Sequence, residues 1–268
     1  MAREVLTELD HGVLRIRMNR PDVHNALDDA MVEGLRQAID QAESDSTVQI
    51  ALLEGEGPSF CAGADLAWMR ELAAAPAEEN LASAERLARL FQALDRFDKP
   101  LVGRVQGAVF GGGVGLVAMC DVAVAARSSR FALSEVRLGL IPAVIAPFVL
   151  RRIGAAAARD LVLTARRFAA PEARDIGLLG RVVDDTLLDE AVQGTLADLR
   201  AGGPLAVRAA KKLLRELETT TRRGDDLARF SAQLLAKSRE GSEARAGLAA
   251  FLDKSPPPWL TGDQGPRP

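Results

Sequence analysis

The sequence has little of what builds metal centres, disulfide frameworks or membrane spans. Its 268 residues include only two cysteines, Cys61 and Cys120, and two histidines, His11 and His24. Neither pair has the spacing of metal ligands, so a zinc site is not expected. A disulfide framework is not expected either, which fits a reducing compartment. Every long apolar run meets a glycine, a proline or a charge well before the ~18 residues that a membrane helix needs.

An excess of charge of either sign is also missing. The formal net charge is −3, so no global field would recruit nucleic acid or an anionic membrane. The first ten residues, MAREVLTELD, lack the apolar core of a secretory signal. We therefore expect a cytoplasmic protein that binds neither nucleic acid nor membrane. The hydrophobic content of 48% allows a sizeable core at this length.

The hydrophobic pattern of the first half predicts an α/β protein. Apolar and charged residues alternate over residues 13–18 (VLRIRM), which is typical of a half-buried strand. Asp28 can cap a helix over residues 29–43, whose apolar residues fall on one face. The other elements expected in this half are strands at 48–53, 101–105, 121–126 and 130–133, and helices at 78–97 and 114–119.

The second half is predicted to be helical. A helical pattern begins at about residue 155, and helices are expected at 186–201, 204–220, 224–238 and 242–252. We expect an α/β core over residues 1–185, a helical region over 186–255 and a proline-rich tail over 256–268. A helical appendage of this kind packs either on neighbouring subunits or on its own core.

The most unusual stretch is FGGGVGLVAMCDVAVAA, residues 110–126. Glycine inside a helix or strand costs roughly 0.5–1 kcal/mol relative to alanine, so three in a row need a reason. A phosphate loop of the G-x-x-x-x-G-K-[ST] type is absent. Gly113, Gly115 and Ala118 fit G-x-G-x-x-A, but this stretch lies mid-chain and its helix is short, which counts against a dinucleotide site. A tight turn under close packing is the other interpretation.

Two small-residue loops could act together on a developing negative charge. Residues 111–113 precede the predicted helix at 114–119, and amides at the start of a helix favour negative charge. The second loop is FCAGADL, residues 60–66, in which Asp65 can cap a helix that begins at Leu66. Each loop leads into a helix, so together they could direct two amide groups at one carbonyl oxygen.

A carboxylate is the best remaining candidate for proton transfer. The serine-hydrolase pattern G-x-S-x-G is absent, and neither histidine has a nucleophile nearby in the sequence. Cys61 has the surroundings of a small packed residue rather than of a reactive thiolate. Glu135, in FALSEVRLGLIP, follows a short apolar strand and is our candidate acid or base. The alternative for Glu135 is an ordinary solvated glutamate.

Five stretches together resemble the crotonase superfamily, also called the enoyl-CoA hydratase/isomerase family. They are NRPDVHNAL, FCAGADLAWM, VQGAVFGGGVGLVAMCD, RFALSEVRLGLIPA and AFLDKSPPPW, and in this order they span nearly the whole chain. The resemblance implies a fold made of a spiral of ββα units with C-terminal helices. It also implies assembly into homotrimers or into hexamers that are pairs of trimers.

The same resemblance implies the functional residues. The amides of Ala64 and Gly112 would form an oxyanion hole for a thioester carbonyl, and Glu135 would act as acid or base. Lys254 would reach the phosphates of coenzyme A, often across a subunit boundary. The other expected contacts with coenzyme A, made largely through backbone groups, are His24, Ala26, Ala62, Asp65 and Leu66. Coenzyme A is part of the substrate, and no metal or additional cofactor is expected.

One position departs from the family pattern. Typical hydratases carry a second glutamate two residues beyond the glycine triplet, where this chain has Gly115. Glu135 could therefore both activate water and return the proton in a hydration. Alternatively, it could shuttle a proton along the acyl chain, as the enoyl-CoA isomerases of the family do. We expect hydration of an α,β-unsaturated, branched acyl-CoA, with isomerisation as the alternative.

Three motifs narrow the resemblance further. GADLAWM, GGGVGL and LSEVRLGLIPAVIAPFV are similar to the methylglutaconyl-CoA and isohexenylglutaconyl-CoA hydratases of leucine and acyclic terpenoid breakdown. Their substrates carry a distal carboxylate, for which Arg137 or Arg70 could supply a cation, and Trp68 could line the pocket. One relative in this branch also binds RNA, but this chain lacks a basic stripe interleaved with aromatics, which argues against that role.

Overall fold

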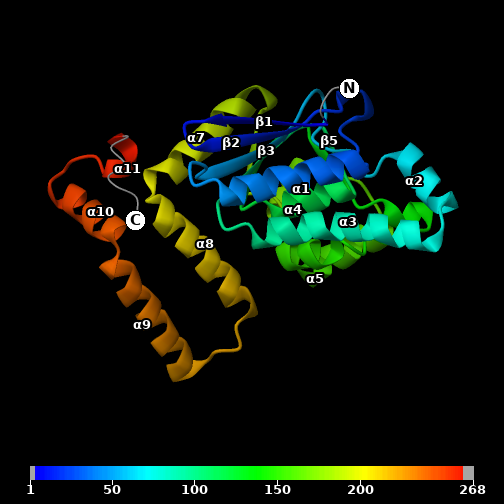
Figure 1. Ribbon diagram of the computed structural model, residues 1–268. Coiled ribbons are helices and arrows are strands. Elements are labelled where there is room, and N and C mark those ends of the chain that lie inside the picture. The colour runs from blue at the N-terminus through cyan, green and yellow to red at the C-terminus, as the bar shows by residue number, and fades with distance from the viewer. Residues whose placement is uncertain (1–3, 262–268) are drawn as a thin grey trace. The chain divides into compact units, whose positions relative to one another are not determined.

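The computed structural model describes residues 4–261, which form two compact units (Figure 1). Unit 1 comprises the described residues up to Phe97 together with Leu101–Gly194. Unit 2 comprises Asp98–Pro100 together with the described residues from Thr195 onward. Residues 262–268 of the predicted tail lie outside the described residues.

The larger sheet of unit 1 has six strands, which are β1 (Val5–Asp10), β2 (Val13–Met18), β3 (Ile50–Gly55), β4 (Leu101–Val105), β6 (Val122–Ala126) and β9 (Arg181–Val183). They lie in the order β1-β2-β3-β4-β6-β9. Strand β1 is antiparallel to β2, and all the other neighbours are parallel. The predicted alternation in β2 is confirmed, because Leu14, Ile16 and Met18 are buried.

A smaller sheet of three strands lies in the same unit. It consists of β5 (Ala108–Phe110), β7 (Arg130–Ala132) and β8 (Phe168–Ala169). Strand β5 is parallel to β7, whereas β8 is antiparallel to it. This sheet matters for function because β5 leads directly into the glycine run and β7 ends three residues before Glu135.

The helices of unit 1 are α1 (Asp29–Ser44), α2 (Leu66–Ala74), α3 (Ala77–Arg96), α4 (Gly112–Met119), α5 (Ala146–Thr164), α6 (Ala170–Asp175) and the first turns of α7 (Leu188–Ala201). Short 3-10 helices are η1 (Pro21–Val23), η2 (Glu135–Leu138) and η3 (Asp185–Leu187). Figure 1 shows α1, α3 and α5 below strands β1–β3 in this view, with α4 among them. Helix α1 packs on α3, and α4 packs on α5.

One continuous apolar core holds these layers together. Phe60, Phe91, Phe97 and Phe131 are fully buried within it. Burying an aromatic or large aliphatic side chain contributes roughly 1.5–3 kcal/mol, so this core dominates the stability of unit 1. Phe91 of α3 also stacks on Phe148 of α5, with ring centroids 5.7 Å apart. This contact fixes α5 against α3 close to the second turn of α4.

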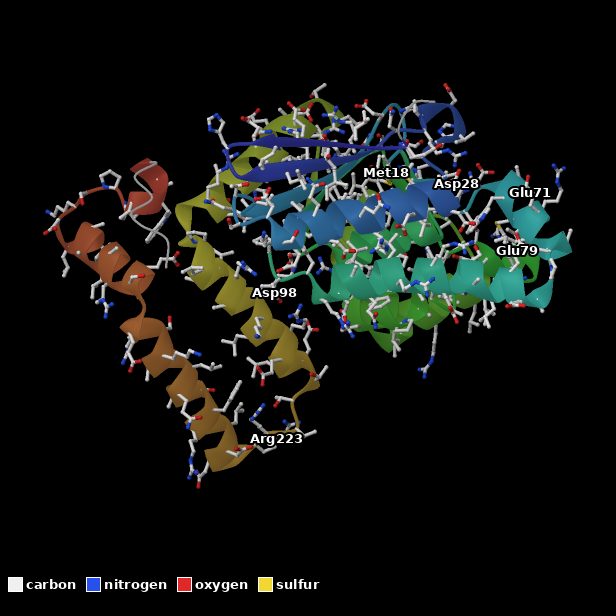
Figure 2. The ribbon with its side chains drawn as sticks, in the orientation of Figure 1. Met18, Asp28, Glu71, Glu79, Asp98 and Arg223 are labelled. Carbon is white, nitrogen blue, oxygen red and sulfur yellow. The ribbon has the colours of Figure 1, made fainter. Side chains whose placement is uncertain are left out.

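The predicted start of α1 is confirmed. Asp28 is its N-cap residue, and Oδ1 of its carboxylate accepts a hydrogen bond from the amide of Met31 at 2.8 Å. A cap of this kind is worth about 1 kcal/mol relative to alanine. In Figure 2, Asp28 marks the beginning of α1, at the end of unit 1 where Glu71 of α2 and Glu79 of α3 also lie.

Unit 2 consists of helices, as its sequence predicts. They are the last turns of α7 followed by α8 (Pro204–Thr219), α9 (Gly224–Glu240), α10 (Ser242–Leu252) and the short α11 (Pro258–Thr261). Glu243 accepts hydrogen bonds from the amides of Leu205 and Ala206 at the start of α8. Large apolar side chains of this unit remain exposed on the single chain, among them Leu205, Leu214, Leu248, Phe251 and Leu252.

The division between the units falls after Gly194 rather than after residue 185. The first turns of α7 belong to unit 1, where Leu188 and Val192 are buried. In the same turns, Asp189 forms an ion pair with Arg104 of β4 at 2.6 Å. Helical periodicity alone could not reveal on which unit these turns pack, because the pattern of α7 is continuous.

Candidate active site

Three segments that are far apart in the sequence meet at one place in unit 1. The amide of Leu27 donates to the carbonyl of Gly63 at 2.7 Å, and the amide of Asp65 donates to the carbonyl of Leu27 at 2.9 Å. On the other side, the amide of Phe110 donates to the carbonyl of Cys61 at 2.9 Å. The loop at 60–65 therefore lies between the segment that precedes α1 and the segment that precedes α4.

The bridge between Leu27 and Ala64 determines where the Ala64 amide points. Leu27 uses the carbonyl of Gly63 and the amide of Asp65, the residues on either side of Ala64. The carbonyl of Gly63 and the amide N–H of Ala64 belong to the same trans peptide group and point in opposite directions, so the Ala64 amide points away from Leu27. No backbone carbonyl within residues 4–261 accepts a hydrogen bond from it. The Ala64 amide is thus an unengaged donor.

The Gly112 amide is a second unengaged donor beside this loop. Gly112 is the first residue of α4, and an amide in this position has no partner inside its own helix. In the part of the chain that the structure describes, no other backbone carbonyl takes up this amide. The two loops touch, since a β-carbon built on Gly111 would lie 3.8 Å from Cα of Gly63.

The residues at 111–113 are glycines because backbone and side-chain atoms of other segments approach them too closely for a β-carbon. Gly113 lies directly over the other loop, and a β-carbon there would overlap the carbonyl oxygen of Cys61. Gly111 has a φ of +47°, a conformation that side chains disfavour, and a β-carbon there would be 2.9 Å from Oε1 of Glu135. These glycines let backbone meet backbone and let a carboxylate reach the start of α4.

Glu135 faces these loops. It is the first residue of η2, it is half-buried, and its Oε1 lies against the backbone of Gly111. Its Oε2 is buried and accepts no hydrogen bond from any residue between 4 and 261. Burial raises the pKa of the Glu135 carboxyl above its ordinary value of 4.5. A carboxyl group with a raised pKa and an unengaged oxygen is suited to accept and return a proton.

The residues of unit 1 that are expected to contact coenzyme A gather around the same loops. His24 is exposed, has a φ of +54°, and its Nδ1 lies 2.9 Å from Oγ of Ser59. Ala26 is buried, and the Ala62 amide donates to the carbonyl of His24 at 3.0 Å. Leu66 is 72% exposed at the start of α2. Lys254 belongs to unit 2.

Asp65 has a structural task in this arrangement. Oδ1 of its carboxylate caps α2 by accepting from the amide of Ala67 at 2.9 Å, and Oδ2 lies 2.9 Å from Nη2 of Arg20. Burial would raise the pKa of Asp65, but the hydrogen bonds from the amide of Ala67 and the guanidinium of Arg20 outweigh it, and the pKa is lowered. Asp65 is therefore held as a carboxylate that orients the loop containing Ala64.

Two residues that the sequence did not single out, Arg20 and Asn25, hold the segment before α1 in place. Arg20 also donates from Nη1 to the carbonyl of Ala26 at 2.8 Å. Asn25 is fully buried, and its Nδ2 donates to the carbonyls of Glu56 and Ser59. The acceptors on the second loop lie 31–45 residues away in the sequence, so no local pattern could have revealed these roles.

Comparison with known proteins decides the family. The chain matches the family described as enoyl-CoA hydratase/isomerase over residues 8–262. The chain belongs to this family. It is 32% identical to the 2,3-dehydroadipyl-CoA hydratase of Escherichia coli, with 95% of this chain and 97% of that protein covered. It is also 32% identical to the 1,2-epoxyphenylacetyl-CoA isomerase of Escherichia coli, with 96% and 98% covered.

A solved structure confirms the fold of this family member. The crystal structure of an enoyl-CoA hydratase from Shewanella pealeana is 41% identical, superposes with a TM-score of 0.89 and covers 96% of both chains. The predicted crotonase-type fold, an α/β core with a helical C-terminal region, is confirmed. The likeness to methylglutaconyl-CoA hydratases in particular stays a prediction.

At position 115, where typical hydratases carry their second glutamate, neighbouring apolar side chains fill the space beside the helix. Gly115 lies in the second turn of α4 and is buried. A β-carbon there would be 2.5 Å from Cγ2 of Ile145 and 2.9 Å from Cζ of Phe91. The absence of a side chain at 115 therefore leaves no gap, because two apolar side chains fill the space.

An apolar cavity of about 490 Å³ lies along α5 in unit 1. Its lining includes Leu133, Ile145 and Leu163, and Arg159 is the only charged residue of the lining. Neither Glu135 nor the glycine loops line it. Arg137 and Arg70, the cations considered for a distal carboxylate, are exposed, and Trp68 is half-buried in α2.

The part of the chain that the structure describes contains neither a metal-binding cluster nor a membrane-spanning helix. Within residues 4–261, no three or more His, Cys, Asp or Glu side chains are grouped so that they could hold a metal ion. No helix in the same range combines the length and the apolar composition that crossing a membrane requires.

Proposed function

We propose that this family member is an enoyl-CoA hydratase that adds water to the double bond of an α,β-unsaturated, branched acyl-CoA. The observation that carries the proposal is Glu135, whose unengaged, buried Oε2 and raised pKa occur beside the two unengaged amides of Ala64 and Gly112. The 2,3-dehydroadipyl-CoA hydratase of Escherichia coli supports it as a relative named for hydration.

In this proposal the amides of Ala64 and Gly112 donate to the thioester carbonyl oxygen of the substrate. Negative charge builds up on that oxygen when the double bond is attacked, so the amides stabilise the enolate more than the ground state. Removing one such donor typically costs about 2.7–4 kcal/mol of transition-state stabilisation.

Glu135 carries out both proton transfers of the hydration. Its carboxylate removes a proton from a water molecule while the water oxygen bonds to the β-carbon, and the π electrons of the double bond move to the thioester enolate. The same carboxyl group then returns the proton to the α-carbon as the carbonyl reforms. The balance is one water added, with no oxidation or reduction, so the proposal requires no redox cofactor and no metal.

Binding of coenzyme A is assigned to the rim of the same loops. Backbone groups of His24, Ala26, Ala62, Asp65 and Leu66 would contact the coenzyme. Lys254 would approach its phosphates from a neighbouring subunit. The exposure of Leu66 supports this assignment, because a leucine that is 72% exposed next to a capped helix start is available to cover an adenine or pantetheine surface.

The branched acyl group and its distal carboxylate are finer parts of the proposal. Among the relatives, 2,3-dehydroadipyl-CoA hydratase is named for a substrate with a second carboxyl group. Arg137 follows Glu135 by two residues and is exposed, so it is our first candidate for the partner of such a carboxylate. Replacing Arg137 by Gln should raise the KM for 3-methylglutaconyl-CoA and leave the KM for crotonyl-CoA unchanged.

We further propose that the chain assembles as a homotrimer or a hexamer through the helical region at 186–255, in the cytoplasm. The exposed side chains of Leu248, Phe251 and Leu252 support this, because large apolar side chains gathered on one helix are typical of surfaces that are covered in an assembly. Sedimentation velocity would test the assembly, and a monomer at micromolar concentration would contradict it.

Absorbance of the conjugated thioester tests the reaction. Addition of water to crotonyl-CoA or 3-methylglutaconyl-CoA removes the conjugation, so the band should disappear on addition of the protein. Glu135→Gln should lose nearly all turnover and still bind the thioester. Glu79→Gln, on the exposed start of α3, is the matched control and should turn over normally. Near-normal rates for Glu135→Gln would remove Glu135 from the mechanism.

Double-bond isomerisation is the second candidate function, and Gly115 favours it. With one carboxylate, a proton can be taken from one carbon of the acyl chain and returned to another, without water. A 3-enoyl-CoA would then gain the conjugated band rather than lose it. The 1,2-epoxyphenylacetyl-CoA isomerase of Escherichia coli, another relative, is named for an isomerisation. Rates with a 3-enoyl-CoA that exceed those with crotonyl-CoA would favour this candidate over hydration.

A further inference from the structure

The packing around the second turn of α4 leaves no room for a side chain at position 115. The seal, as used below, is the packing of Ile145 and Phe91 against Gly115. A β-carbon on Gly115 would be 2.5 Å from Cγ2 and 2.9 Å from Cβ of Ile145. Rotation of the Ile145 side chain about χ1 moves Cγ2 but leaves Cβ in place. The clash with Cβ therefore persists in every rotamer of Ile145.

Ile145 and Phe91, which fill the space beside Gly115, are themselves fixed by buried contacts. Ile145 is 3% exposed at the start of α5, where its carbonyl accepts from the amides of Phe148 and Val149. Phe91 is fully buried in α3 and stacks on Phe148. Displacing side chains in such a closely packed core costs free energy, so neither Ile145 nor Phe91 can move far from Gly115.

The seal is close to the candidate acid–base group. The Gly115 amide donates to the carbonyl of Gly111 at 3.2 Å, so the two glycines are one helical turn apart, which is about 5.4 Å along the axis. Oε1 of Glu135 lies against Gly111, at the start of that turn. The apolar pair Ile145 and Phe91 therefore occupies the place one turn beyond the carboxylate of Glu135.

We propose that Ile145, together with Phe91, excludes a second acid–base side chain from position 115 of α4, so that Glu135 is the sole proton-transfer group of the site. The inference rests on the proposed function for its chemical consequence, whereas the steric seal stands independently of it. It also means that positions 115 and 145 are coupled. A carboxylate at 115 requires a residue without a β-carbon at 145.

A double-mutant cycle tests the seal without any need for turnover. Gly115→Glu should unfold many degrees below the wild type or fail to accumulate as folded protein. Ile145→Gly removes the two Ile145 atoms that clash, Cγ2 and Cβ, while Cζ of Phe91 remains. It also places glycine at a helix N-cap position, where it is tolerated. Ile145→Gly alone lowers stability by leaving a cavity, so the cycle compares the two backgrounds. Gly115→Glu should lower the melting temperature less in the Ile145→Gly background than in the wild type.

A matched control separates the seal from the general cost of a new glutamate. Gly194 is a helical, exposed residue, and a β-carbon there would meet nothing within 4 Å. Gly194→Glu should melt within about 2 °C of the wild type, as surface substitutions do. If Gly115→Glu is as stable as Gly194→Glu, or if it lowers the melting temperature equally in the wild type and in the Ile145→Gly background, the proposal is overturned.

The pH profile of kcat/KM tests the chemical consequence. With Glu135 as the sole proton-transfer group, the wild type should show one ionisation in the carboxyl range. The residual activity of Glu135→Gln should show none. An ionisation in that range that survives in Glu135→Gln would overturn the inference. A wild type that turns over no enoyl-CoA in either direction would refute the proposed function instead, while the melting cycle would still report on the seal.

Discussion

Nη2 of Arg20 and Oδ2 of Asp65 lie 2.9 Å apart and join two loops that are 45 residues apart in the sequence. The pair is largely shielded from water, with 19% of the Arg20 side chain and 14% of the Asp65 side chain exposed. The same guanidinium also contacts Glu4 and Asp28. Arg20 is thus the point at which the loop before α1 is tied to the loop that contains Ala64.

Replacing Arg20 by Gln should therefore loosen the loop as well as lower stability. Each lost hydrogen bond to a charged group costs about 1.5–3 kcal/mol. We expect a fall in kcat with a smaller change in KM. Arg20→Lys should recover part of it, because lysine keeps the charge but lacks the planar guanidinium that bonds several partners at once. Urea unfolding and steady-state kinetics would measure both effects.

Arg36 provides the matched control for that experiment. It pairs with Glu33 of the same helix, α1, and not with a residue of either loop. Arg36→Gln should change the free energy of unfolding by no more than about 0.5 kcal/mol and leave kcat unchanged. If Arg20→Gln were as stable and as active as Arg36→Gln, the role of Arg20 in holding the loops would be refuted.

The raised pKa of Glu135 makes stability depend on pH in a defined direction. The folded state keeps the proton to higher pH than the unfolded state does, where the carboxyl titrates near 4.5. The stabilising contribution is therefore present in full below pH 4.5 and is lost as the pH rises through the folded-state pKa. Glu135→Gln, which cannot ionise, should lose none of it.

Melting temperatures of both proteins across the acid and neutral range would measure this effect. As the pH rises from about 4 to about 7, through the range in which carboxyl groups ionise, the melting temperature of Glu135→Gln should increase relative to that of the wild type. The activity of the wild type should rise over the same pH range, because only the ionised carboxylate of Glu135 can accept a proton. A constant difference in melting temperature would mean that burial does not penalise the Glu135 carboxylate.

Cys61 should be unreactive in the folded protein. Burial raises the pKa of its thiol to about 12, so almost no thiolate exists at neutral pH. Cys120 is buried as well. A thiol reagent such as DTNB should therefore release almost no chromophore from the native protein and two equivalents from the denatured protein. Rapid native labelling of Cys61, identified by mass spectrometry, would contradict its position under Gly113.

Gly113→Ala tests the contact between the two loops. The added methyl group would overlap the carbonyl oxygen of Cys61, which is backbone and cannot rotate away. Overpacking of this kind typically costs about 1–3 kcal/mol, and it should also lower kcat by moving the start of α4. Gly194→Ala, in open space on α7, should instead stabilise the protein by roughly 0.5–1 kcal/mol. Equal melting temperatures for the two variants would refute the contact.

The elements that follow from local pattern were predictable. The alternation in β2 and the cap at Asp28 depend on residues within one turn or one strand, and both are confirmed. The predicted helix at 78–97 corresponds to α3, which begins and ends one residue earlier. The strand β1 was not predicted, because five of its six residues are exposed or nearly so and its pairing with β2 supplies the stabilising contacts.

The geometry of the candidate site required the structure. A sequence shows that Gly115 lacks a carboxylate, but not that Ile145 and Phe91 fill the space around it. Their contacts join residues 24–30 positions apart, and packing between such distant residues leaves no periodic signal. The predicted helix at 155–165 is the second part of α5, which begins at Ala146 and is interrupted at Gly154. The predicted tail likewise contains the short α11.

The donors at Ala64 and Gly112 belong to the main chain, and this has a consequence for how the chain can change over time. Every amino acid except proline carries an amide, so substitutions at these two positions preserve the donor as long as the loop keeps its path. Whether the two donors persist during evolution then depends on the shape of the two turns and on the glycines that allow this shape. It depends less on which residues stand at positions 64 and 112.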